Sequence, residues 1–163
     1  MENKIVEKFG NRLRVRVSGI LIENDALLLV RHSALGEKGI LWAPPGGGMK
    51  YGRTIEENLK REFLEETALE IAIERFLFLN EYLAPPLHAV ELFFQVSRLG
   101  GDLTKGIDPE MGRGEQIIQE VGFIPFEELA EMEGIILHQA IRGCHSAEAL
   151  LERSGYIKFG SSA

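Results

Sequence analysis

The chain has 163 residues, of which 45% are hydrophobic and 26% are charged, and its formal net charge is -7. This length and composition predict one globular domain with a sizeable core, and they exclude a disordered chain. The acidic balance, with a sequence pI of about 5.2, disfavours a general nucleic-acid binder that works by neutralising phosphates.

The cysteine count and the apolar runs bear on cellular location. Cys144 is the single cysteine, which excludes an internal disulfide, and the chain begins with a polar segment over 1–4. The longest apolar run, 26–30, is the size of a strand and far shorter than a membrane span. We therefore expect a cytoplasmic protein that binds neither a membrane nor, stably, a nucleic acid.

The first part of the chain has the composition of a β-hairpin. β-Branched and apolar residues over 13–23 predict a strand. Asn24 and Asp25 form a tight-turn dipeptide, which predicts pairing with a second strand over 26–30.

A short apolar segment over 40–42 leads through two prolines to three glycines, 46–48. Thr54 opens the clearest helix, which we expect to run to about Ala68. Thr54 and Glu57 have the spacing of a capping box.

The rest of the chain mixes strands with helices. The expected elements are strands over 71–83, 89–96 and 119–124, a short helix over 125–132 and a longer amphipathic helix over 138–153. Five glycines lie between 100 and 116 without an apolar period, which is typical of a functional loop. This mixture predicts an α/β or α+β layered domain.

Glutamates lie on the side of the first long helix that faces the protein. At 100° per residue, Leu59, Glu62 and Glu66 fall on one arc with Ile55, and Glu65 lies on its flank. A solvated charged face, the usual explanation of such a run, fits poorly because the arc also carries the apolar residues. Two carboxylates four residues apart repel each other by about 0.2–0.5 kcal/mol even when exposed. A hard divalent cation such as Mg²⁺ or Mn²⁺ would compensate this repulsion.

Three glycines, Gly46, Gly47 and Gly48, stand just before this helix. A glycine triplet is often only a flexible turn. Between a short strand and an acidic helix, however, it lets the backbone approach a ligand closely. Its carbonyls could add metal ligands, and its amides could face phosphate oxygens.

Taken together, the segment 47–69 resembles the signature of the Nudix hydrolases, a family that cleaves nucleoside diphosphates linked to another group. The family pattern is matched in register by Gly47, Arg61, Glu62, Phe63, Glu65, Glu66 and Leu69. The segments 42–46 and 120–129 also resemble the family, so the likeness covers about residues 13–130.

Two positions depart from the family pattern. The first glutamate of the signature falls on Arg53, and its glycine falls on Ala68. We expect Ala68 to cost a little strain where the helix ends. In the family, the replaced glutamate supports the signature arginine. We expect Glu57, four residues before Arg61, to substitute for it.

The resemblance implies a fold and an activity. The fold would be an α/β/α sandwich with a mixed β-sheet, in a single domain over 1–163 with frayed ends at about 1–11 and 156–163. The activity would be metal-dependent hydrolysis of a diphosphate linkage in a nucleoside diphosphate derivative, by attack of water on phosphorus. Mg²⁺ or Mn²⁺ would be the cofactor, and an ADP-ribose-like compound or a nucleoside triphosphate the substrate.

The resemblance also assigns roles at the metal site. Glu62 and Glu66 would be the principal metal ligands, Glu65 a ligand of a further ion, and the Gly46 carbonyl an additional ligand. Arg61 would orient Glu62 or Glu65.

The general base and the substrate-binding residues are less constrained. Family members take the base from the signature helix or from a later loop, so the candidates are Glu110, Glu115 and Glu120. We favour Glu115 and Glu120, which lie beside the expected strand. The residues expected to contact substrate are Gly47, Gly48, Lys50, Tyr82 and Pro85.

Each of the last assignments has a structural alternative. Pro85 lies at the offset that marks ADP-ribose preference in some family members, although two prolines also end a strand. Tyr82 and Phe78 could stack on a base, although core packing is the commoner use of such residues.

A competing hypothesis is a catalytically weak or inactive nucleotide-binding or regulatory module, motivated by Arg53 and Ala68. Family members are often homodimers, which makes self-association an open expectation.

Overall fold

A computed structural model describes residues 2–33, 35–107 and 116–160. The strands are β1 (Arg12–Ile20), β2 (Ile22–Glu23), β3 (Ala26–Ser33), β4 (Ile40–Ala43), β5 (Gly46–Gly48), β6 (Glu70–Ala84), β7 (Leu87–Gly100), β8 (Ile118–Pro125) and β9 (Gly155–Gly160). The helices are α1 (Glu2–Phe9), α2 (Ile55–Thr67), α3 (Phe126–Glu131) and α4 (Ala147–Leu151), with 3₁₀ turns at Gly134–Ile136 and Gln139–Ile141. None of the described helices combines the length and the apolar composition needed to span a membrane.

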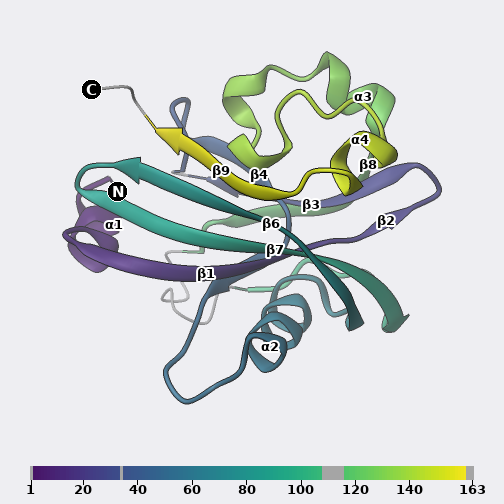
Figure 1. Ribbon diagram of the computed structural model, residues 1–163, viewed down its shortest axis with the longest axis horizontal. Helices are drawn as coiled ribbons and strands as arrows, with labels where there is room; N and C mark the ends of the chain where they lie inside the picture. Colours follow the sequence, from purple (N-terminus) through teal and green to yellow (C-terminus); the bar gives the residue numbers. More distant parts are fainter. Residues whose placement is uncertain (1, 34, 108–115, 161–163) are drawn as a thin grey trace.

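The strands form two sheets that lie between helices. One sheet has the order β5-β1-β7-β6-β9, and β3 pairs in the other sheet with β2, β4 and β8. The first sheet is mixed, because β1 and β7 run parallel whereas β6 and β7 run antiparallel. Helix α2 covers one side, and α3 and α4 lie on the other (Figure 1). The expected α/β/α sandwich with a mixed sheet is confirmed.

Each side of the sheets has its own hydrophobic core. On the α2 side, Leu59 and Phe63 pack against Val17 and Leu28. On the opposite side, the apolar faces of α3 and α4 join the core through Phe126, Leu129 and Leu150. Leu27, Leu28 and Leu29 of β3 alternate between the two cores, as the two-residue period of a strand requires.

The predicted hairpin is confirmed only next to its turn. The strand expected over 13–23 divides into β1, which pairs in the other sheet, and β2, which pairs with β3. Asn24 and Asp25 both have positive φ, 50° and 58°, and β2 pairs antiparallel with β3 directly after them. These are the dihedrals of a type I′ turn, for which asparagine and aspartate are favoured. The turn aligns β3 as the central strand of the second sheet.

The three glycines are an edge strand, a pairing that the sequence does not indicate. β5 pairs antiparallel with β1, with Gly46, Gly47 and Gly48 opposite Ser18, Val17 and Arg16. Gly46 is needed there, because its φ is 158° and a Cβ would lie 2.2 Å from the carbonyl oxygen of Val17. The edge strand therefore brings bare backbone against helix α2.

Helix α2 begins and ends as its sequence predicts. The Thr54 side chain accepts a hydrogen bond from the Glu57 amide, and the Glu57 side chain accepts one from the Thr54 amide. Ala68 adopts the left-handed conformation with φ of 60°, which glycine would adopt at lower cost.

The segment 101–107 packs against the C-terminal end of α2. The amides of Thr104 and Gly106 donate to the carbonyls of Thr67 and Glu66, at 3.0 and 2.9 Å. These bonds satisfy carbonyl groups that the helix itself leaves unpaired. Part of the predicted functional loop is thus tied to α2, while its residues 108–115 lie outside the described part of the chain.

Three expectations for the ends of the chain are wrong. Helix α1 forms where a frayed end was expected, and β9 pairs parallel with β6 over residues expected to fray. β9 covers the edge of β6, which would otherwise expose unpaired backbone groups. The helix expected over 138–153 is instead a 3₁₀ turn followed by α4. Gly143, with φ of 73°, interrupts it, and Ser146 caps a new helix.

Candidate active site

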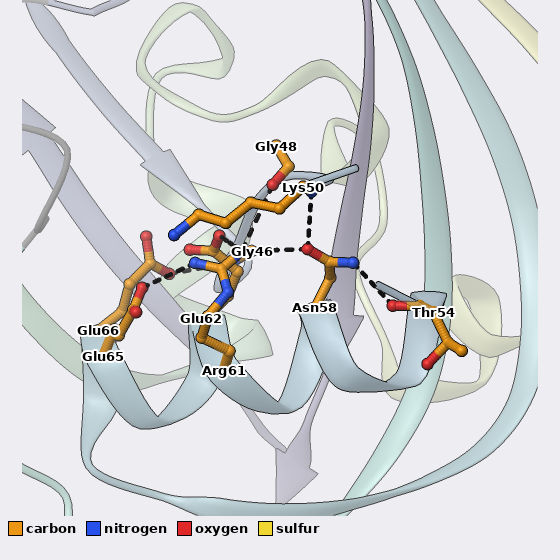
Figure 2. A network of polar contacts seen from close by, with 9 residues as sticks. All are labelled: Gly46, Gly48, Lys50, Thr54, Asn58, Arg61, Glu62, Glu65 and Glu66. Atoms are coloured by element: carbon orange, nitrogen blue, oxygen red, sulfur yellow. Dashed lines mark hydrogen bonds and ion pairs between the residues drawn. The ribbon is translucent and has the colours of Figure 1, made fainter. Parts of the chain in front are cut away.

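Helix α2 buries two carboxylates against strand β5. Glu62 and Glu66 are 8% and 6% exposed, and they share a helix face with Leu59, as the 100° spacing predicts. Glu65 lies on the flank, where 26% of its side chain is exposed. Figure 2 shows the three glutamates together beside Gly46 and Gly48.

The glycine backbone of β5 contacts these carboxylates directly. The Gly46 amide donates to Oε2 of Glu66 at 2.9 Å. A Cβ on Gly47 would lie 2.5 Å from the carboxyl carbon of Glu62. Gly47 therefore leaves the space that Glu62 occupies, which explains why a glycine is needed at this position.

Arg61 lies between two of the glutamates. Its Nη2 is 2.8 Å from Oε1 of Glu62, and its Nη1 is 3.0 Å from Oε2 of Glu65. The same Nη2 lies 3.5 Å from the carbonyl oxygen of Gly48, so one guanidinium joins α2 to β5 (Figure 2). Arg61 thus contacts both of the residues that it was expected to orient.

Asn58, rather than Glu57, supports Arg61. Asn58 is fully buried, and its Oδ1 accepts from Arg61 at 3.2 Å and from the Lys50 amide at 2.9 Å. Its Nδ2 donates to the carbonyl oxygen of Thr54. Glu57 is engaged in the capping box, so its expected role is wrong. Asn58 was readable from the sequence, because it lies on the same arc as Glu62, four residues earlier.

Among the described residues, the three carboxylates of the site outnumber its one paired arginine, Arg61. Burial and the neighbouring Glu66 carboxylate raise the pKa of Glu62 to about 7, although Arg61 opposes this. His32 in β3 lies near, with Nε2 3.9 Å from Oε1 of Glu66, and its buried Nδ1 has no hydrogen-bond partner among the described residues. No local pattern in the sequence indicates His32, because the pairing of β3 that brings it here is long-range.

A comparison with protein families decides the relationship. The model of the NUDIX domain matches residues 12–141, most of the chain. The chain belongs to the Nudix family. Of the signature residues, the polar ones gather beside β5, whereas Phe63 and Leu69 pack in the hydrophobic core.

Relatives and solved structures agree with this placement. An ADP-ribose pyrophosphatase of Methanocaldococcus jannaschii is 32% identical over 96 residues, which are 58% of this chain and 56% of that relative. The chain thus matches little more than half the length of that protein. A Nudix hydrolase of Nitrosomonas europaea has a TM-score of 0.66 at 17% identity, covering 86% of this chain and 88% of the other. An ADP-ribose pyrophosphatase of Streptococcus suis has a TM-score of 0.59 at 17% identity, covering 88% and 98%. At these identities the two structures show the fold.

Nudix hydrolases use divalent metal ions, and the donor groups here suit such an ion. Glu62 and Glu66 offer buried, mutually repelling carboxylate oxygens, which a hard cation would neutralise. As they stand, no three His, Cys, Asp or Glu side chains in the described ranges form a metal site. Arg61 pairs with Glu62 and Glu65 in this arrangement.

The other residues expected at the site are spread more widely. The Lys50 amide joins the site through Asn58, and its side chain runs toward the glutamates in Figure 2. Tyr82 lies on β6, partly buried, and Pro85 is exposed in the β6–β7 turn. Phe78 is fully buried and stacks on Phe93, which is a core role.

Of the two glutamates favoured as the general base, the structure describes only Glu120. Glu120 is exposed on β8, opposite Arg31. Val121 and Phe123 pack in the α2-side core, so the alternation of a strand puts Glu120 on the face away from α2. The described contacts do not bring Glu120 to the glutamates of α2. Glu115 lies outside the described residues.

A hollow of about 630 Å³ lies at the other end of the large sheet. Its charged residues are already partnered, since Arg98 pairs with Glu23 and Arg75 hydrogen-bonds to Gln95. It is lined by none of the signature residues.

Proposed function

We propose that this chain hydrolyses a diphosphate linkage in a nucleoside diphosphate derivative, with Mg²⁺ or Mn²⁺ as cofactor. The observation that carries the proposal is the buried pair Glu62 and Glu66 beside the bare backbone of β5. Burying two like charges is costly unless a cation joins them, so the pair is arranged for a ligand that the chain must bind. The relative named ADP-ribose pyrophosphatase makes ADP-ribose the first substrate to test.

The reaction splits the anhydride with one water molecule. The water oxygen bonds to one phosphorus while the bridging P–O bond breaks, so ADP-ribose would give AMP and ribose 5-phosphate. The bound cation supplies charge neutralisation at the phosphate oxygens and acidifies the water. Glu62, Glu65 and Glu66 would hold the cation, and Arg61, which pairs with the first two, would orient them. The backbone of 46–48 lets the phosphates approach without a side chain in the way.

The proton of the attacking water passes to a general base. Of the two glutamates favoured for this role, Glu120 lies on the face away from α2. We therefore favour Glu115 over Glu120. Its segment follows residues 101–107, which are tied to the end of α2.

The cellular location and the oligomeric state are also proposals. Buried Cys144, the single cysteine of the sequence, agrees with a cytoplasmic location. Self-association into a homodimer is tested by light scattering of the purified chain.

A substrate panel in ¹⁸O-labelled water tests the activity. ADP-ribose, a sugar nucleotide and a nucleoside triphosphate are incubated with and without Mg²⁺, and the products are analysed by mass spectrometry. We expect Mg²⁺-dependent release of a nucleoside monophosphate with one ¹⁸O incorporated into a single product. The position of the label identifies the phosphorus that is attacked. Lack of turnover with every compound would contradict the proposal.

The competing function is a nucleotide-binding module without catalysis. It is favoured by one observation, namely that Arg61 already pairs with Glu62 and Glu65. Binding of ADP-ribose without turnover in the same panel, at any Mg²⁺ or Mn²⁺ concentration, would support this function instead.

A further inference from the structure

A buried ionic cluster lies on the large sheet next to the candidate site. Glu91 in β7 is 5% exposed, and its Oε2 accepts from Nδ2 of Asn80 at 2.8 Å. Nε2 of His138 lies 3.1 Å from the same oxygen. Nε of Arg16 lies 3.3 Å from the other oxygen. A carboxylate in this position is retained only with such partners.

The cluster holds one end of Arg16 and leaves the other exposed. The ion pair with Glu91 involves the Nε atom, while 29% of the Arg16 side chain is exposed. Among the described residues, its two terminal nitrogens donate no hydrogen bond. An arginine fixed in this way presents a fork of donors, which suits a phosphate oxygen pair.

The strand register places Arg16 beside the glycine strand of the candidate site. Arg16 is opposite Gly48 in β5 on one side and opposite Glu91 in β7 on the other. The adjacent residue, Gly47, faces the opposite side of the strand, and Glu62 fills the space there. Arg16 and Glu62 thus lie on opposite sides of β5, an edge strand whose glycines place no side chain between the two faces.

Neighbours on the same face extend the positive charge. Arg14, two residues before Arg16, has its Nη2 3.3 Å from the place where a Gly48 side chain would begin. Tyr82 follows Asn80 by two residues on β6 and shares this face. A chain with a net charge of -7 thus sets arginines along the edge strand, opposite the glutamates.

We infer that Arg16, positioned by Glu91, binds a phosphate group of the substrate on the side of β5 opposite the cation. This assignment rests on the proposed function and deepens it. The carboxylates of α2 hold the cation, whereas Arg16 contacts phosphate oxygens directly and fixes where the diphosphate lies. Glu91 and Asn80 act through Arg16 and do not touch the substrate.

A titration that needs no turnover tests the inference. The metal-free protein is titrated with inorganic pyrophosphate, and the Nε–Hε signals of arginine side chains are followed by NMR. The Arg16 signal is assigned with the Arg16→Lys variant. We expect a saturable shift of the Arg16 signal and a fixed signal for Arg98, which is paired with Glu23 at the far end of the sheet. A fixed Arg16 signal overturns the inference, even if the chain hydrolyses ADP-ribose.

Steady-state kinetics of ADP-ribose hydrolysis test the same inference on the active protein. Arg16→Ala should raise KM about 10- to 100-fold, as expected for a lost charged hydrogen bond, with a smaller change in kcat. Arg98→Ala should leave KM unchanged. The KM of Arg16→Lys should lie between those of the wild type and of Arg16→Ala. An unchanged KM in Arg16→Ala contradicts the inference. Absence of turnover in the wild type instead contradicts the proposed function and leaves the titration as the test.

A double-mutant cycle tests Glu91 as a positioning residue. Glu91→Gln should weaken pyrophosphate binding in the wild-type background and add no further loss to Arg16→Ala. Circular dichroism checks that each variant is folded, and Asn80→Ala serves as a milder second variant. A Glu91→Gln effect that persists in full without Arg16 would show that Glu91 does not act through it.

Discussion

The amide of Gly46 donates a hydrogen bond of 2.9 Å to the carboxylate of Glu66, which fastens the edge strand β5 to helix α2. The bond fixes one oxygen of a buried carboxylate beside a backbone that carries no side chain. The glutamates of α2 can therefore meet a cation, and the phosphates can meet the backbone, at one place. This closeness of helix and glycine strand underlies the proposed hydrolase activity.

Gly47→Ala should lower activity strongly. The added Cβ would lie 2.5 Å from the Glu62 carboxyl carbon, so Glu62 must move away from β5. The rate of ADP-ribose hydrolysis measures the effect. Gly122→Ala in β8 is the matched control, because a Cβ there meets nothing within 4 Å. Equal rates for the two variants would show that Glu62 does not need its present position.

Asn58→Ala should destabilise the protein and weaken the site together. The substitution leaves the Lys50 amide and Arg61 without the acceptor that they share, at a cost of about 1–3 kcal/mol in the free energy of unfolding. Urea unfolding measures the stability, and steady-state kinetics measure the activity. A fully active variant would mean that Asn58 supports α2 but not the orientation of Arg61.

Arg53→Glu, which restores the family residue, should leave activity unchanged or higher. Arg53 is exposed and lies 3.9 Å from Glu57, away from the bonds that hold Arg61. The new carboxylate would face Glu57 four residues on, which costs about 0.2–0.5 kcal/mol of stability. The measurement is kcat/KM for ADP-ribose. A large fall would assign Arg53 a role of its own, such as holding a phosphate.

Local sequence patterns sufficed for the parts of the site that lie on one element. The 100° spacing placed Glu62 and Glu66 inside, and the Thr54–Glu57 pair marked where α2 begins. The hairpin at Asn24 was readable for the same reason, since its turn depends on two adjacent residues.

The other parts of the fold and the site depend on contacts between residues far apart in sequence, which local patterns do not indicate. The glycines of β5 carry no hydrophobic pattern, so their pairing with β1 depends on tertiary contacts alone. Arg16 and Glu91 are neighbours only because β1 and β7 run parallel, far apart in sequence. The expected helix over 138–153 failed because the φ of 73° at Gly143 ends the 3₁₀ turn before α4 begins.

Acid should remove a stabilising contribution of Glu91. Burial alone raises its pKa, but His138, Arg16 and Asn80 outweigh burial and lower the pKa to about 2. A lowered pKa stabilises the folded state above the ordinary value of 4.5, and the contribution is lost as the pH falls from there toward 2. The full contribution is about 3 kcal/mol.

Urea unfolding at several acidic pH values measures this contribution. In Glu91→Gln the fall in stability between about pH 5 and pH 3 should be shallower than in the wild type. Glu131→Gln, at the exposed end of α3, should keep the wild-type slope. Equal slopes in all three proteins would show that Glu91 is not the residue that titrates.

The most direct test of the account compares Glu66→Gln with Glu56→Gln, which changes an exposed glutamate of the same helix. The measurement is the rate of ADP-ribose hydrolysis at saturating Mg²⁺, with circular dichroism melting as the check on folding. We predict that Glu66→Gln melts like the wild type but turns over about a thousandfold more slowly, and that Glu56→Gln keeps the wild-type rate. A near wild-type rate for Glu66→Gln would contradict the assignment of the buried glutamates as the cation site.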